Sequence, residues 1–243
     1  MGLPIPFPSD SLIEKKTYRG LLRNLWIPSS FDYTVFEDSF QGDTLHTLYP
    51  AAKTDSGTVV FTADNANNFL EIKSGGANGN YAGQGLGLTL TGDRGVLLEG
   101  IIRTPATITD MKWEFGLSDT HSADAGAVNQ KATTTTVNAV DTAVFVYDTT
   151  DDANIAFVTA KAGGVVEVQD IQALLVSTTY RLAIRVEGDN VTAYIDGREV
   201  AGSGGGVGIE GGNKLTPWVF SQARSGSERI LQLHKWRTIQ PAY

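Results

Sequence analysis

The sequence predicts an all-β protein, a two-sheet antiparallel sandwich of the jelly-roll kind that follows a short N-terminal arm containing a helix. Three observations lead to this fold class. From about residue 31 onward, short segments alternate apolar and polar residues, as half-buried strands do. Turn sequences such as SGGANGN, TGDRG, DTTDDAN and EGDN separate these segments, and 27 glycines suit a chain of tight turns. Helical periodicity is confined to the first 30 residues.

The arm is expected to cover residues 1–30 and to begin in an extended conformation. Pro4, Pro6 and Pro8 fix the backbone and remove hydrogen-bond donors, which favours a polyproline-like lead. A capping-box pattern at Ser11 and Glu14 then predicts a helix that ends before Pro28. Its apolar stripe consists of Tyr18, Leu21, Leu22 and Leu25, followed by Trp26.

The sandwich is expected to cover residues 31–243, with strands where the alternating segments fall. The predicted strands are 57–63, 68–73, 86–90, 95–104, 111–118, 142–148, 154–160, 164–169, 179–187, 190–196, 217–222 and 228–239. Short antiparallel strands with almost no helix are typical of two packed sheets. The low-complexity run KATTTT at 131–136 is expected in a loop or an edge strand.

The clearest element is the hairpin YRLAIRVEGDNVTAYIDGREV, residues 180–200. Residues two apart share a face of a strand, and the Gly-Asp-Asn break at 188–190 is a turn sequence. The pattern predicts that one face is buried, namely Leu182, Ile184, Val191, Ala193 and Ile195. It predicts greater exposure for Arg181, Arg185 and Thr192.

Composition excludes several classes of protein. No stretch approaches the roughly 18 apolar residues of a membrane span, and the start MGLPIPFPSDSLIEKK does not resemble a secretory signal. The absence of cysteine excludes disulfides and thiolate metal sites. A net charge of −8 argues against a general nucleic-acid binder. The first 30 residues hold four cations and two carboxylates, net +2, so the rest of the chain carries −10.

Several segments resemble those of concanavalin A-like or laminin G-like sandwich domains. They are FEDSFQGDTL, WEFGLSDT, TAVFVYDT, the hairpin at 180–200 and the closing strand RILQLHKWRTIQ. The resemblance covers about residues 31–240 and implies the fold. Because these motifs consist of packing and turn residues, the resemblance implies little about function.

No catalytic residues, cofactor or metal site are predicted. Glucanases of this superfamily place two glutamates and an aspartate at alternate positions of one strand. Here the i, i+2 carboxylate pair Glu187 and Asp189 is at a hairpin tip, where turn formation explains it. Asp148, Asp151 and Asp152 crowd one loop and are weak candidates for Ca²⁺, but their spacing does not match an EF-hand and suits a turn.

The leading functional hypothesis is a non-enzymatic virion protein, a capsid decoration or other surface protein. The compact, cysteine-free sandwich with an arm loosely resembles virion proteins of tailed bacteriophages. Such a protein would be made in the host cytoplasm, form homo-oligomers, and dock on the major capsid protein or another virion protein. The docking residues would be Pro4, Pro6, Phe7, Pro8, Lys15, Lys16, Tyr18, Arg19, Leu21, Leu22, Arg23, Leu25 and Trp26.

Two alternatives remain open at this point. One is a lectin-like module that binds carbohydrate, for example a host-surface glycan, through a sheet face or the loops. The weaker one is a polysaccharide hydrolase or lyase. An exposed aromatic pair on a sheet would favour the first, and two carboxylates roughly 5–9 Å apart in a cleft would favour the second. Trp113, Trp218 and Trp236 are expected in the core.

Overall fold

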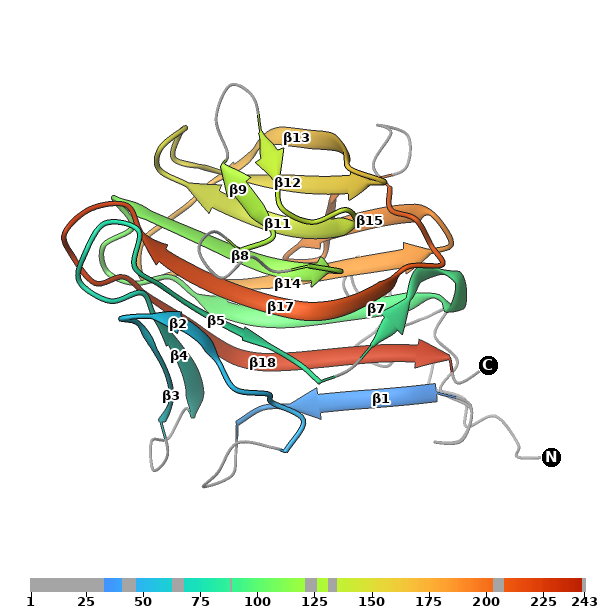
Figure 1. Ribbon diagram of the computed structural model, residues 1–243, viewed down its shortest axis with the longest axis horizontal. Coiled ribbons are helices and arrows are strands. Elements are labelled where there is room, and N and C mark those ends of the chain that lie inside the picture. The colour runs from blue at the N-terminus through green and yellow to red at the C-terminus, as the bar shows by residue number, and fades with distance from the viewer. Residues whose placement is uncertain are drawn as a thin grey trace.

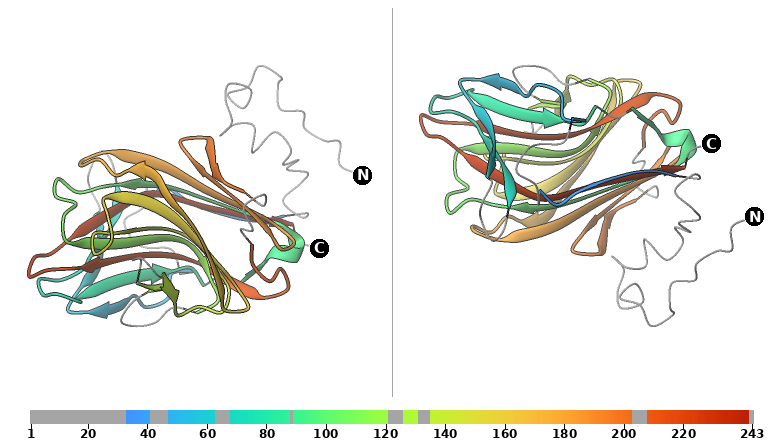
Figure 2. Two further views of the ribbon diagram at one scale, coloured as in Figure 1. Left: turned by 90° about the horizontal axis from the view of Figure 1, so that it is seen from above. Right: turned by 90° about the horizontal axis from the view of Figure 1, so that it is seen from below.

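The chain folds as two antiparallel sheets stacked face to face, as the sequence predicts. The computed structural model describes residues 33–40, 47–62, 68–87, 89–120, 126–130, 135–202 and 208–241. Figure 1 shows the strands of one sheet in front of the other, and Figure 2 shows the two layers from above and below. The architecture is an all-β jelly-roll sandwich of two antiparallel sheets.

The predicted N-terminal helix lies outside the described residues. Within the described ranges, the helical structure is a single 3-10 turn, η1 (Gly92–Arg94). The same part of the chain contains no helix with the length and apolar composition that a membrane span requires.

The first sheet, called sheet A, contains eight strands in the order β16-β15-β14-β7-β18-β4-β3, with β1 paired to the second half of β18. Its strands are β1 (Tyr33–Asp38), β3 (Thr58–Thr62), β4 (Phe69–Lys73), β7 (Val96–Arg103), β14 (Thr179–Glu187), β15 (Asn190–Ile195), β16 (Arg198–Ala201) and β18 (Ile230–Pro241). The central strands β7 and β18 therefore come from segments more than a hundred residues apart in the sequence.

The second sheet, sheet B, also contains eight strands, in the order β13-β12-β11-β8-β17-β5-β2 with β6 paired to β17. Its strands are β2 (Lys53–Asp55), β5 (Tyr81–Gly85), β6 (Leu90–Thr91), β8 (Met111–Ser118), β11 (Thr142–Asp148), β12 (Asn154–Lys161), β13 (Gly164–Ala173) and β17 (Lys214–Ala223). A separate two-stranded ribbon, β9 (Val128–Gln130) and β10 (Thr136–Val137), lies over the strands β11 and β12 in Figure 1.

The core lies between the inner faces of the two sheets. Trp113 and Phe115 of β8 face it from sheet B, and Trp236 of β18 faces it from sheet A. The rings of Phe115 and Trp236 are 6.2 Å apart. Opposite Trp236, Gly100 of β7 leaves space for Phe115, because a Cβ at position 100 would be 2.3 Å from the tip of that ring. A glycine in a central strand is thus explained by close packing.

The hairpin of β14 and β15 has the predicted register. Ile184 pairs with Ala193 and Leu182 pairs with Ile195, and all four are buried. Arg181 is exposed, while Arg185 and Thr192 are partly exposed. Burial of the three tryptophans Trp113, Trp218 and Trp236 is confirmed as well.

Strands with glycine or with little apolar content were missed from the sequence. A strand was predicted at 86–90, whereas β5 occupies Tyr81–Gly85 with the sequence YAGQG. Its Gly83 lies under the ring of Trp218, since a Cβ there would be 2.3 Å from the indole Cη2 atom. Because glycine is a turn signal in sequence, the sequence pattern does not indicate a strand that needs glycine for close ring packing.

Replacement of Ile184 by Asp tests the register of sheet A. The change places an unpaired carboxylate in the core, so the free energy of unfolding should fall by about 3–5 kcal/mol. Thr192→Asp on the opposite face of the neighbouring strand is the control and should cost less than about 1 kcal/mol. Denaturant unfolding measures both, and equal stabilities of the two variants would contradict the register.

Candidate functional site

The outer face of sheet B is covered by the chain itself. Trp218 and Phe220 of β17 and Val144 and Val146 of β11 point away from the core between the sheets and form a second apolar cluster. Ala127 and Val128, at the start of the β9–β10 ribbon, pack into this cluster and are fully buried. Tyr81, Phe220 and Trp218 form a stacked aromatic row beneath the ribbon, with ring centroids 5.8 and 5.9 Å apart.

The carboxylate of Glu114 holds the ribbon on this face. It lies at the centre of β8, is fully buried, and accepts hydrogen bonds from the backbone N–H groups of Ala127 (2.8 Å) and Val128 (3.0 Å). The indole Nε1 of Trp218 donates to the same carboxylate at 3.1 Å. Gly126 has a φ of +72°, and a Cβ there would be 2.6 Å from the Glu114 oxygens. The chain therefore needs glycine where it passes the carboxylate.

Lys112 is the buried counterion of Glu114. Its Nζ lies 2.9 Å from Glu114 Oε1, donates to the backbone carbonyl of Val128, and lies 5.2 Å from the centroid of the Phe220 ring. Burial lowers the pKa of Lys112, and the negative charge of Glu114 opposes this shift. Lys112 and Glu114 are thus committed to closing the outer face of sheet B.

In the acidic loop that follows β11, the buried carboxylate of Asp148 is engaged by other residues of the chain. Asp148, at the end of β11, is fully buried and forms a two-point ion pair with Arg224, whose Nε is 2.9 Å from Oδ1. Its Oδ1 also accepts a hydrogen bond from the Thr150 backbone at 3.1 Å. The described residues contain no group of three or more His, Cys, Asp or Glu side chains that could hold a metal ion. The weak candidates Asp148, Asp151 and Asp152 are therefore not brought together as a ligand set.

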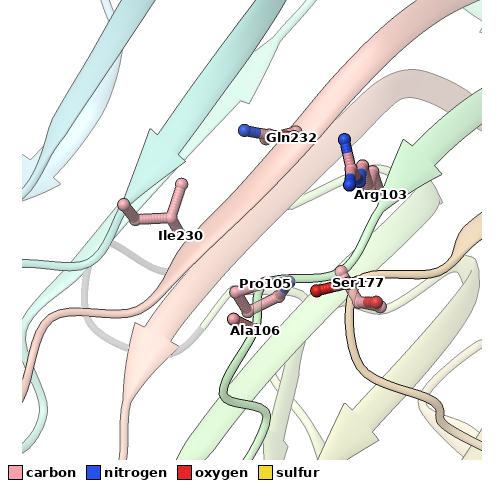
Figure 3. A pocket seen from close by; sticks show the side chains of 7 residues that line it. Arg103, Pro105, Ala106, Ser177, Ile230 and Gln232 are labelled. Carbon is pink, nitrogen blue, oxygen red and sulfur yellow. The ribbon is translucent and has the colours of Figure 1, made fainter.

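Sheet A has an open hollow on its outer face, where β7 ends and β18 begins. Its volume is about 310 Å³, within the range of small-ligand sites. Figure 3 shows Arg103 and Gln232 on these neighbouring strands, with two loops at one end. The lining consists of Arg103, Thr104, Pro105, Ala106, Ser177, Ile230 and Gln232.

Hydrogen bonds join the two loops beside the hollow, residues 104–105 and 175–178. The Thr104 hydroxyl donates to the carbonyl of Leu175 (2.7 Å) and accepts from the backbone N–H of Thr178 (2.9 Å). The backbone N–H of Ser177 donates to the carbonyl of Pro105 at 2.9 Å. Ser177 has a φ of +50°, a conformation that L residues rarely adopt, and these contacts hold it there. The hollow is therefore pre-formed by hydrogen bonds between the two loops.

Polar side chains form a row across the sheet at the hollow. Gln232 pairs with Glu71 of β4 on one side and with Arg103 of β7 on the other. Glu71 is ion-paired with Lys73 at 2.7 Å. One step along β18, His234 packs against Phe69, with ring centroids 5.0 Å apart. Burial, and then the charge of Arg103, lower the pKa of His234, so its imidazole is neutral at neutral pH.

Sequence reasoning missed these residues. Gln232 and His234 alternate with the buried Leu231 and Leu233 in RILQLHKW, so the pattern predicts an outward-facing polar row. No local signal indicates that this row lies beside Arg103, because the pairing of β7 with β18 is long-range. The arm residues proposed for docking lie outside the described residues.

Comparisons with known proteins concern the fold of the chain. No family model matches the sequence, and no curated protein matches it significantly. A glycoside hydrolase family 16 endo-glucanase from Bacteroides ovatus has a TM-score of 0.56 at 9% identity, over 84% of this chain and 99% of that one. The transglycosylase Crh5 has a TM-score of 0.56 at 13% identity, over 86% and 85% of the two chains.

A third similar structure is an endo-β-1,4-glucuronan lyase from the fungus Trichoderma reesei. Its TM-score is 0.51 at 9% identity, over 76% of this chain and 88% of that one. At such low identities the likeness establishes the shared fold. The chain is thus similar to glycan-cleaving and glycan-transferring enzymes in architecture.

These comparisons contradict the prediction of a non-enzymatic virion protein. The similar structures include hydrolases, a transglycosylase and a lyase, and none of those reported is described as a capsid decoration or bacteriophage protein. The prediction relied on compactness, absence of cysteine and an N-terminal arm, which many proteins share and which specify no site chemistry. The carbohydrate alternatives agree better with the comparisons.

Replacement of Glu114 by Gln tests the closure of sheet B. The variant leaves the Lys112 ammonium buried without a counterion, so the free energy of unfolding should fall by about 3–5 kcal/mol. The double variant with Lys112→Met should be more stable than the single one, because the uncompensated charge is gone. Glu71→Gln breaks a partly exposed ion pair and should cost less than about 1 kcal/mol. Equal losses in Glu114→Gln and Glu71→Gln, measured by denaturant unfolding, would contradict this role.

Proposed function

We propose that the protein binds a polysaccharide at the hollow of sheet A. The observation that carries the proposal is the pre-formed hollow in which hydrogen-bonding side chains lie beside apolar ones. A sugar ring presents hydroxyl groups at its edge and C–H groups on its faces. Gln232 and Ser177 offer polar contacts, whereas Pro105 and Ile230 offer apolar surface. Such a mixture is typical of small-molecule sites.

Two further features support this location. The outer face of sheet B is filled by the β9–β10 ribbon, so its aromatic row is not available to a ligand. Beside the hollow, Leu175 and Val176 are 57% and 50% exposed. They extend the apolar surface along the loop that precedes Ser177, which suits a ligand longer than one sugar unit. The similar architecture of known polysaccharide-active proteins agrees with the proposal.

Replacement of Gln232 by Ala tests the binding function. The wild-type protein should bind at least one member of a panel of β-glucans, xylan, alginate, polygalacturonate and β-1,4-glucuronan. Loss of the amide hydrogen bonds should weaken that binding roughly two- to tenfold. Gln169→Ala, on an exposed position of β13, is the matched control and should leave binding unchanged. Affinity electrophoresis measures both. Absence of binding to every polymer, or equal effects of the two variants, would contradict the proposal.

A second candidate function is cleavage of the bound polysaccharide. The enzymes among the similar structures favour it, as does a neutral imidazole beside the hollow. His234 Nε2 has no hydrogen-bond partner among the described residues, and neutral histidine is a common general base. This role requires that the ring become accessible when a ligand binds.

Replacement of His234 by Asn tests cleavage separately from binding. The wild-type protein should release new chain ends from the bound polymer, detected as reducing sugar or as unsaturated product. The variant should keep binding within about twofold and lose at least about 99% of product formation, since general bases contribute roughly 10²–10⁴-fold. Wild-type protein that binds without releasing product would exclude this second function and leave the binding function intact.

A further inference from the structure

Arg103 is the one charged side chain among the residues that line the hollow. Arg103 is exposed at the end of β7, and no ion pair joins it to a carboxylate within the described residues. Three other cations on the outer face of sheet A are paired with carboxylates. Lys73 is paired with Glu71 at 2.7 Å, Lys235 with Glu37 at 2.7 Å, and Arg237 with Glu37 and Glu99 at 3.1 and 3.4 Å. In a chain of net charge −8, a free guanidinium at a hollow is available to an anionic ligand.

The surroundings of Arg103 favour a negative group. The residues that line the hollow include no carboxylate. Gln232, opposite Arg103 on β18, and Ser177 contribute side chains that can donate hydrogen bonds. The nearest carboxylate in the row, Glu71, is held by Lys73. An acidic ligand group would therefore meet one positive charge and donors from two other elements without direct repulsion.

The geometry of the Arg103 guanidinium indicates which kind of anionic group the hollow would bind. Arginine presents a planar fork of N–H groups that matches the two oxygens of a carboxylate. The apolar surfaces of Pro105, Ala106 and Ile230 beside it suit the C–H face of a sugar ring. A sugar that carries a carboxylate on its ring combines both features.

We propose that the hollow selects acidic polysaccharides, with the carboxylate of a uronic acid residue bound by Arg103 and supported by Gln232 and Ser177. This inference rests on the proposed binding function and adds the class of polysaccharide to it. A neutral glucan of the same backbone would leave the guanidinium without its partner and should bind more weakly.

The experiment compares acidic polymers with their carboxyl-reduced counterparts. Alginate, polygalacturonate and β-1,4-glucuronan are each reduced so that the carboxylate becomes a primary alcohol and the backbone stays the same. For the acidic polymer that the wild-type protein binds, reduction should weaken binding roughly ten- to a hundredfold, because hydrogen bonds to charged groups are the stronger class.

Variants separate a specific contact from general attraction to a polyanion. Arg103→Gln should cause a loss of similar size on the acidic polymer and little further loss on the reduced one. Arg103→Lys keeps the positive charge but lacks the planar fork of N–H groups. Its affinity for the acidic polymer should lie between that of the wild-type protein and that of Arg103→Gln. Arg198→Gln removes the same charge from an exposed position on the edge strand β16 and should leave affinity unchanged.

The outcomes distinguish this inference from the proposed function. Equal binding of the acidic and reduced polymers, or binding of neutral glucans alone, would overturn the selectivity and retain polysaccharide binding. Equal losses in Arg103→Gln and Arg198→Gln would also overturn it, because general polyanion attraction would then explain the binding. Absence of binding to every polymer would refute the proposed function itself.

Discussion

The buried carboxylate of Glu114 determines which face of this sandwich is open. A single side chain at the centre of β8 accepts three hydrogen bonds, two from the backbone of the β9–β10 ribbon and one from Trp218. Burying an ionised carboxylate is costly unless charge and hydrogen bonds compensate it. Lys112 and these donors provide the compensation, and the donors come from a ribbon that must therefore stay in place. The outer face of sheet B is closed as a result.

The outer face of sheet A differs from that of sheet B because its ion pairs are partly exposed to solvent. Along β18 and its neighbours most cations have a carboxylate within ion-pair distance, and these partly exposed pairs contribute little to stability. Arg103 departs from that arrangement at the point where two loops rise beside the sheet. The loops are held by the Thr104 hydroxyl and by backbone hydrogen bonds, so the ligand need not order them. A pre-formed site avoids part of the entropic cost of binding.

The shared architecture explains how proteins with about one residue in ten in common can have similar structures. The fold requires apolar residues on two inner faces and turns between strands, and many sequences satisfy both conditions. The chemistry depends on a few outward-facing positions, which the fold leaves free to vary. In this chain the outward-facing side chains of β11 are Thr142, Val144, Val146 and Asp148, and all four are buried. Val144 and Val146 pack in the cluster with the ribbon, and Asp148 is ion-paired with Arg224. Similarity of fold therefore does not determine the chemistry of a site.

The sequence by itself determined the all-β class, the β14–β15 hairpin with its buried face, and the burial of Trp113, Trp218 and Trp236. These features depend on alternation and turn residues, which act over a few neighbouring positions. Strands such as β5 were missed because Gly83 serves packing against Trp218, a contact across 135 positions of the chain. The hollow, and the hydrogen bonds by which Glu114 holds the β9–β10 ribbon, were decided by tertiary structure alone. Gln232 meets Arg103, and Glu114 meets Trp218, only after long-range strand pairing, which leaves no periodic signal in the sequence. Ala127 reaches Glu114 only when the β9–β10 ribbon packs on the outer face of sheet B.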